Sequence, residues 1–97
     1  MSNQLHYNTL SLNDDTKSCI IDGNEVNLTK REYQLLKFFL ENPNYIYTRK
    51  ELIEKFWDHK GSERAVDSTI SRLRKNIKQY GSNIVTKIGY GYYFKTE

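Results

Sequence analysis

Cysteine, proline and long apolar runs are all scarce in this sequence of 97 residues. A single cysteine, Cys19, excludes an internal disulfide and a thiol-rich metal site, so we expect a buried, reduced thiol. No apolar stretch approaches the roughly 18 residues that a membrane-spanning helix needs. The first twenty residues lack a basic start followed by an apolar block, so we expect no signal peptide, no membrane contact and a cytoplasmic location.

Patterns typical of catalysis are also missing. The two histidines, His6 and His59, are isolated, and no nucleophile has a nearby general base in the sequence. We therefore expect neither an enzyme nor a metal or cofactor site. With one proline and no low-complexity tract, the composition is that of an ordinary folded chain. The length favours a single domain over residues 1–97 with one modest core.

Positive charge is distributed unevenly along the chain. The net charge is only +3, but residues 1–59 hold seven Lys/Arg and nine Asp/Glu, whereas residues 60–95 hold eight and two. The first segment is therefore weakly acidic and the second strongly basic. This asymmetry points to a polyanion as the natural partner of the C-terminal third.

The order of apolar patterns predicts an α+β chain that begins with a small antiparallel sheet. Residues 4–28 have strand character, with one extended stretch over 5–13 and a tight-turn dipeptide at Asp22-Gly23. Two S/T-x-x-E capping boxes, which begin at Thr29 and Thr48, then predict helix starts.

Three helices and a hairpin should follow the sheet. We expect helices over about 29–42, 49–57 and 63–80, with Gly81 as the C-cap glycine of the third. A hairpin over about 84–95, with glycines on either side of Tyr90, should close the chain.

The third helix has two contrasting faces. Its apolar residues recur at helical spacing and form one narrow stripe: Val66, Ile70, Leu73, Ile77 and Tyr80. The opposite face is basic and short-chained: Arg64, Ser68, Ser71, Arg72 and Lys75, flanked by Arg74 and Lys78. A solvated face would be the usual explanation, but such faces interleave Glu with Lys, and this one omits Glu. Because a B-DNA major groove admits an α-helix and its phosphates attract Lys and Arg, we predict a helix-turn-helix with this helix in the groove.

Three segments carry a family resemblance: LTKREYQLLKFFLENPNYIYTRKELIEKFW (28–57), RAVDSTISRLRKNI (64–77) and GYGYYF (89–94). They are similar to the winged-helix DNA-binding domain of OmpR/PhoB-type bacterial response regulators. The resemblance implies a domain that binds duplex DNA as tandem half-sites, with a second copy of itself beside it. It also implies transcription regulation in a two-component system under an N-terminal phosphoacceptor domain.

The resemblance also implies particular contacts. Arg64, Thr69, Ser71, Arg72 and Arg74 fall where the family contacts DNA. Trp57 matches a family tryptophan whose indole N–H can meet a phosphate, with plain core packing as its alternative. The hairpin becomes a wing at the adjacent minor groove, with Lys87 and Tyr90 as its contact residues. In some relatives the loop at 58–63 touches RNA polymerase.

The sequence departs from the family pattern at several positions. The family often has Arg just before the first wing glycine, where this chain has Ile88, and the cation moves to Lys87. Ser71 and Ala65 stand where Arg and Thr are frequent. A stand-alone regulator and a protein-interaction module remain alternatives, the latter without DNA binding. Double-stranded RNA is less suitable because its major groove is too narrow for a helix.

Overall fold

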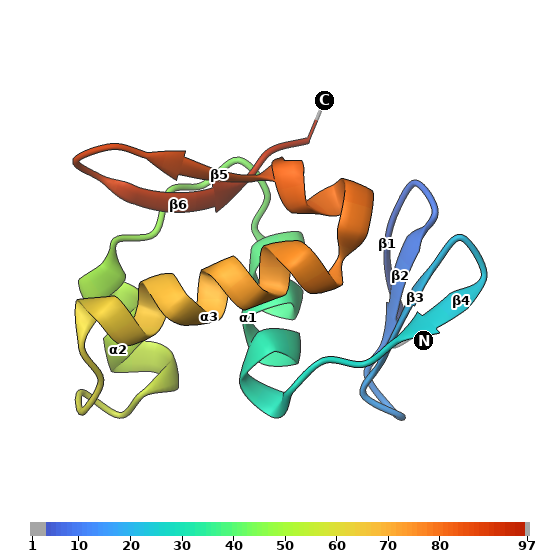
Figure 1. Ribbon diagram of the computed structural model, residues 1–97, viewed down its shortest axis with the longest axis horizontal. Coiled ribbons are helices and arrows are strands. Elements are labelled where there is room, and N and C mark those ends of the chain that lie inside the picture. The colour runs from blue at the N-terminus through green and yellow to red at the C-terminus, as the bar shows by residue number, and fades with distance from the viewer. Residues whose placement is uncertain (1–3, 97) are drawn as a thin grey trace.

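The computed structural model describes residues 4–96 as two antiparallel sheets around three α-helices (Figure 1). The N-terminal sheet contains β1 (Gln4–Tyr7), β2 (Leu10–Asn13), β3 (Ser18–Ile21) and β4 (Asn24–Val26), paired in sequence order. The helices are α1 (Lys30–Glu41), α2 (Arg49–Phe56) and α3 (Glu63–Asn76). A 3-10 helix, η1 (Lys78–Asn83), leads into the hairpin of β5 (Ile84–Lys87) and β6 (Gly91–Phe94). The α+β winged-helix class predicted from the sequence is confirmed.

The N-terminal sheet is built from strand alternation. Leu10 and Leu12 on β2 and Cys19 and Ile21 on β3 are buried, while their neighbours are more exposed. Residues 5–13, predicted as one extended stretch, form two strands. Asn8, with φ of 54°, breaks the extension between them. Asparagine adopts this left-handed conformation with less strain than most residues, so the turn costs little free energy.

Both capping boxes form as predicted. Thr29 Oγ1 accepts from the Glu32 N–H at 3.2 Å, and Glu32 Oε1 accepts from the Thr29 N–H at 3.2 Å. Thr48 and Glu51 repeat the exchange at 3.0 and 2.9 Å. The boxes satisfy backbone donors that the first turn of a helix leaves free, so α1 and α2 begin at fixed residues.

The third helix is shorter than the apolar pattern predicts, because α3 ends at Asn76 rather than near residue 80. Lys78, with φ of 55°, is the left-handed residue that follows the helix, and Gly81 lies within η1. Gly81 is needed for a different reason: a Cβ there would overlap the backbone carbonyl of Arg74. Tyr80 is buried all the same, and its hydroxyl accepts a hydrogen bond from the Thr9 N–H at 2.8 Å.

One apolar core joins all of these parts. Its fully buried side chains come from both sheets and all three helices, and include Leu10, Leu35, Phe39, Leu52, Ile70 and Phe94. Figure 1 shows the N-terminal sheet at one end of the molecule and the β5–β6 hairpin running alongside α3. Within residues 4–96, no helix combines the length and apolar character needed to cross a membrane.

Candidate nucleic-acid interface

The apolar and basic faces of α3 separate as the helical spacing predicts. Val66, Ile70 and Leu73 are fully buried, and Ile77, which caps the helix, is buried with them. The basic face lies in solvent, with five exposed side chains: Arg64, Ser68, Ser71, Arg72 and Lys75. Ser62 caps the N-terminus by accepting from the Ala65 N–H at 3.1 Å. The helix is therefore held by its inner face and presents its outer face freely.

Carboxylates leave both ends of this face unpaired among the described residues. Among residues 4–96, no carboxylate forms an ion pair with Arg64 or Lys75. Asp67, an acid in the body of α3, is bound on the helix flank by Arg49, with Nε and Oδ1 2.7 Å apart. The charge at both ends of the basic face is therefore available to an external anion.

Arg72 is only partly available. Its Nε lies 3.6 Å from Oε2 of Glu32, a carboxylate that is 2% exposed, and its Nη2 lies 3.4 Å from the hydroxyl of Thr69. Asn76 also donates to Glu32 Oε1, at 2.9 Å. Since 62% of the Arg72 side chain remains exposed, its guanidinium can turn toward an external anion. That movement would break its ion pair with the buried Glu32 carboxylate.

Thr69, which the family resemblance placed among the DNA contacts, is buried. Its side chain is 5% exposed, and its hydroxyl donates to the Ala65 carbonyl at 2.9 Å. This hydrogen bond within the helix uses the hydroxyl that a base or phosphate would need. In this structure Thr69 packs α3 rather than presenting a polar atom to solvent.

Arg74 joins α3 to the hairpin. Its Nε donates to the Ile84 carbonyl at 3.0 Å, and its Nη2 donates to Thr86 Oγ1 at 2.6 Å. The guanidinium carbon also lies 5.6 Å from the centre of the Tyr92 ring. Arg74 was expected to reach a phosphate, but two of its guanidinium nitrogens donate to β5 instead. These contacts position the hairpin against α3.

A second link between α3 and the hairpin centres on Asp67. The Tyr92 hydroxyl and Arg49 Nε both donate to its Oδ1, and Arg49 also lies over the Tyr92 ring. Burial raises the pKa of Asp67, but the hydrogen bonds from Tyr92 and Arg49 outweigh it and lower the pKa below its usual value. Burial, followed by the Asp67 carboxylate, raises the pKa of Tyr92. The Asp67 carboxylate thus stays charged and the Tyr92 phenol stays neutral, so the phenol can donate its hydrogen bond to the carboxylate.

The hairpin also pairs with the segment before α2. Tyr47 and Tyr92 exchange backbone hydrogen bonds of 2.9 and 3.0 Å in an antiparallel bridge. Gly91 makes this approach possible, because a Cβ there would lie 2.7 Å from the Tyr47 carbonyl carbon and 2.9 Å from Thr48 Cα. Together with the contacts of Arg74 and Asp67, this bridge holds the hairpin against both α2 and α3.

The two wing residues predicted to contact DNA are both exposed, as is Lys78. Lys87 follows Thr86, whose hydroxyl faces α3 through Arg74, so strand alternation turns Lys87 toward the opposite face. Tyr90 lies at the tip and is 65% exposed. Lys78 lies beyond the end of α3, so its direction no longer follows the helical spacing used to predict its role.

Trp57 ends α2 beside a cationic hollow that the sequence patterns did not predict. The Arg31 guanidinium carbon lies 4.5 Å from the centre of its ring, and Gly61 lies against the ring, where a Cβ would overlap it. The Trp57 side chain is half-buried against the core, as its packing alternative expects, and no described residue accepts a hydrogen bond from its indole N–H.

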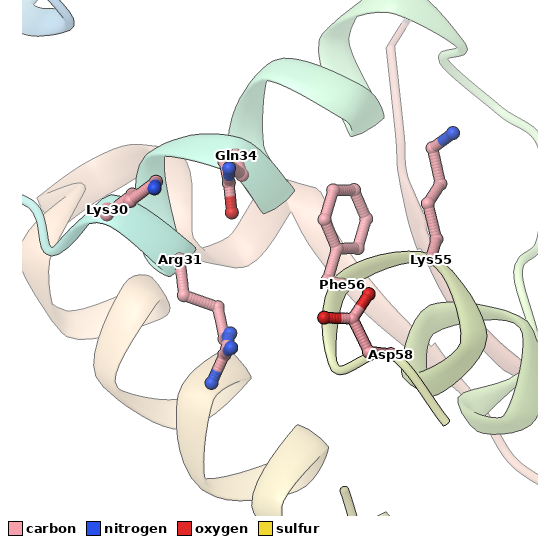
Figure 2. Close-up of a pocket in the computed structure, with 6 residues that line it drawn as sticks. All are labelled: Lys30, Arg31, Gln34, Lys55, Phe56 and Asp58. Atoms are coloured by element: carbon pink, nitrogen blue, oxygen red, sulfur yellow. The ribbon is translucent and has the colours of Figure 1, made fainter. Parts of the chain in front are cut away.

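The hollow beside Trp57 has a volume of about 510 Å³ (Figure 2). Arg31 and Gln34 of α1 lie on one side of it, and Phe56 and Asp58 lie on the other. The complete lining is Lys30, Arg31, Gln34, Lys55, Phe56 and Asp58. The sequence did contain a signal: two cations in the first turn of α1 oppose the helix dipole, which favours acids there. Among residues 4–96, no cluster of His, Cys, Asp or Glu could hold a metal ion.

Known proteins resemble this chain over nearly its whole length. The family model for the C-terminal part of transcriptional regulatory proteins matches residues 23–94. The transcriptional regulatory protein ResD of Bacillus subtilis is 35% identical over 99 residues, covering 96% of this chain and 41% of ResD. The heme response regulator HssR of Staphylococcus epidermidis is 37% identical over 94 residues, covering 93% and 42%. The chain thus spans less than half the length of these curated relatives.

Solved structures share the fold. The response regulator DrrB, a Thermotoga maritima OmpR/PhoB homologue, matches with a TM-score of 0.88 at 31% identity, over 97% of this chain and 45% of DrrB. The DNA-binding domain of the response regulator AdeR, solved in complex with an intercistronic region, matches with a TM-score of 0.84 at 31% identity, over 95% and 98%. The prediction from the three sequence motifs is confirmed: this chain belongs to the family of C-terminal domains of transcriptional regulatory proteins, of the OmpR/PhoB type.

Proposed function

We propose that this domain binds duplex DNA in a sequence-specific way and regulates transcription, as the effector part of a two-component response regulator in a bacterial cytoplasm. The observation that carries the proposal is the exposed face of α3, on which Arg64 and Lys75 have no carboxylate partner among residues 4–96. The relatives support it, since ResD is a transcriptional regulatory protein and the AdeR domain was solved with DNA.

In the proposed complex, α3 enters the major groove and the hairpin lies at the adjacent minor groove. Arg64, Ser68, Ser71 and Lys75 face the bases and the groove edges, and Arg72 joins them by turning away from Glu32. The two serines leave room for the helix to approach the bases closely. Phosphate contacts supply most of the affinity, and contacts to base edges supply the specificity.

Cations beside α3 meet the phosphates in this proposal. Trp57 offers its indole N–H, and Arg31, stacked on that ring, adds a fixed positive charge on the same side. Lys78 and Lys87 are outer phosphate candidates. Arg74 contributes by holding the wing at its two hydrogen bonds.

The first experiment selects bound sequences from a random duplex pool and then measures affinity against salt concentration. Each phosphate contact should contribute about −0.9 to the slope of log K against log salt. Arg64→Ala and Lys75→Ala should each weaken binding by about tenfold or more. Lys17→Ala removes an exposed cation of the N-terminal sheet and should leave affinity unchanged. Binding that does not weaken with salt would instead favour the protein-interaction module.

Two further parts of the proposal concern partners. A second copy should bind a neighbouring half-site, which the selected sequences would reveal as a direct repeat. The loop between α2 and α3 would meet RNA polymerase, and Asp58→Ala or His59→Ala should then reduce transcription in a reconstituted assay without reducing DNA binding. A receiver domain before this chain is the proposed source of control, because the relatives are more than twice as long. A stand-alone regulator would show full activity without it.

A further inference from the structure

The tip of the hairpin exposes apolar side chains. The Tyr90 N–H donates to the Lys87 carbonyl at 2.9 Å, which closes a four-residue turn with Ile88 at its first corner. Gly89, with φ of 84°, takes the second corner, where a left-handed conformation favours glycine. Ile88 is 90% exposed, more than any other large apolar side chain of the described residues. An isoleucine this exposed contributes almost no buried apolar area to the fold, so its side chain is available for contact with a partner.

This tip is held firmly at its base. Arg74 binds two positions of β5, and the Tyr47–Tyr92 bridge holds β6. The tip therefore projects from a rigid support at a defined place beside the basic face of α3. An exposed side chain on such a support can make a specific contact at little cost in conformational entropy.

The wing carries little positive charge where it would meet a nucleic acid. Lys87 is the one cation of residues 84–94, and strand alternation turns it away from the face of the sheet that carries Thr86 and Tyr92. The tip itself exposes the side chain of Ile88 and the ring of Tyr90. A contact made through these two side chains would be apolar rather than ionic.

We propose that Ile88, supported by Tyr90, inserts into the minor groove as an apolar wedge and makes this domain sensitive to the deformability of its DNA site. The inference rests on the proposed function and deepens it. Minor-groove proteins place apolar side chains against base steps and partly unstack them. Pyrimidine–purine steps such as TA and CA deform most easily, so binding should favour one of them under the tip.

The wedge has a distinctive dependence on salt, because apolar contact releases no counterions. Ile88→Ala should weaken binding by about tenfold through lost apolar burial, while the salt slope stays unchanged. Ile88→Arg should steepen the slope by about 0.9, the value for one added phosphate contact. Ile20→Ala, on the N-terminal sheet, is the matched control for losing an exposed isoleucine and should change neither.

The test compares these variants by fluorescence anisotropy on one selected site over a range of salt concentrations. A second duplex replaces the flexible step under the tip with a stiff A-tract, which should weaken the wild type and leave Ile88→Ala unaffected. Because Ile88 touches little of the folded chain, thermal unfolding should match the wild type and exclude misfolding as a cause.

Two results would overturn the wedge and leave the proposed function intact. One is wild-type affinity for Ile88→Ala at every salt concentration. The other is a loss for Ile88→Ala only on two-site DNA, which would assign the tip to contact with a second copy. A wild-type protein that binds no duplex from the pool would refute the proposed function itself.

Discussion

Replacing Gly91 with alanine should separate the wing from the rest of the domain. The added Cβ would overlap the Tyr47 carbonyl oxygen and lie 2.7 Å from its carbon and 2.9 Å from Thr48 Cα. All three atoms are backbone, so none can move aside by a rotamer change. The Tyr47–Tyr92 bridge must therefore open, and its two hydrogen bonds of 2.9 and 3.0 Å are lost.

The expected loss follows from these contacts. Two backbone hydrogen bonds contribute about 1 kcal/mol each to stability, and displacement of the hairpin exposes part of the core around Tyr92. We expect the free energy of unfolding to fall by about 2–4 kcal/mol. For a domain of this size that lowers the melting temperature by roughly 10–25 °C.

Gly89→Ala is the matched control, because it changes the other wing glycine. Gly89 also has a left-handed φ, but apart from its chain neighbours no heavy atom lies within 4 Å of the place that an alanine Cβ would take. Its cost should be conformational strain alone, about 1 kcal/mol. Thermal unfolding by circular dichroism measures both variants, and hydrogen exchange at the Tyr92 amide reports on the bridge. If Gly91→Ala loses no more stability than Gly89→Ala, the bridge does not hold the wing.

Three further predictions concern buried or paired groups. Glu32→Gln keeps an oxygen for Asn76 but removes the charge that attracts Arg72, so affinity for DNA should rise by roughly two- to fivefold and the salt slope should steepen. The lowered pKa of Asp67 means that its pairing stabilises the fold above the ordinary carboxyl value of 3.8 and is lost as pH falls through the lowered pKa. Asp67→Asn should therefore be less stable than the wild type at neutral pH, and the difference should vanish in acid denaturation curves. Burial raises the pKa of Cys19 to about 11, so a thiol reagent should label it only when the domain unfolds, at a rate that follows unfolding across variants.

The parts of the fold that local chemistry decides could be predicted from the sequence. A capping box joins residues three apart, so Thr29 with Glu32 and Thr48 with Glu51 already contain their partners. The inner stripe of α3 is likewise a local pattern: Val66, Ile70 and Leu73 are buried as predicted, although Thr69, expected at the DNA, is buried beside them. Family motifs then supplied the arrangement of sheets and helices, which no single pattern contains.

Contacts between distant segments explain what the sequence could not supply. The end of α3 depends on Gly81 packing against the Arg74 carbonyl and on Tyr80 reaching Thr9, 71 residues away. The apolar pattern continues through this turn because Tyr80 is still buried, so spacing alone extends the helix too far. Arg31 was missed for the same reason, since its stacking on Trp57 links α1 to the end of α2.

The role of Arg74 shows how structure and recognition divide the charges of this domain. A helical wheel counts it with Lys75 as a cation near the free face, but its partners on β5 make it part of the scaffold. Asp67 is paired within the fold in the same way, because Arg49 and Tyr92 both donate hydrogen bonds to its carboxylate. Because Asp67 is already paired with Arg49, it does not neutralise the cations of the free face. Arg64 and Lys75 therefore remain available to an external anion. Stability and affinity should therefore depend on largely different residues of one helix, and substitution of the free face can change the DNA site without unfolding the domain.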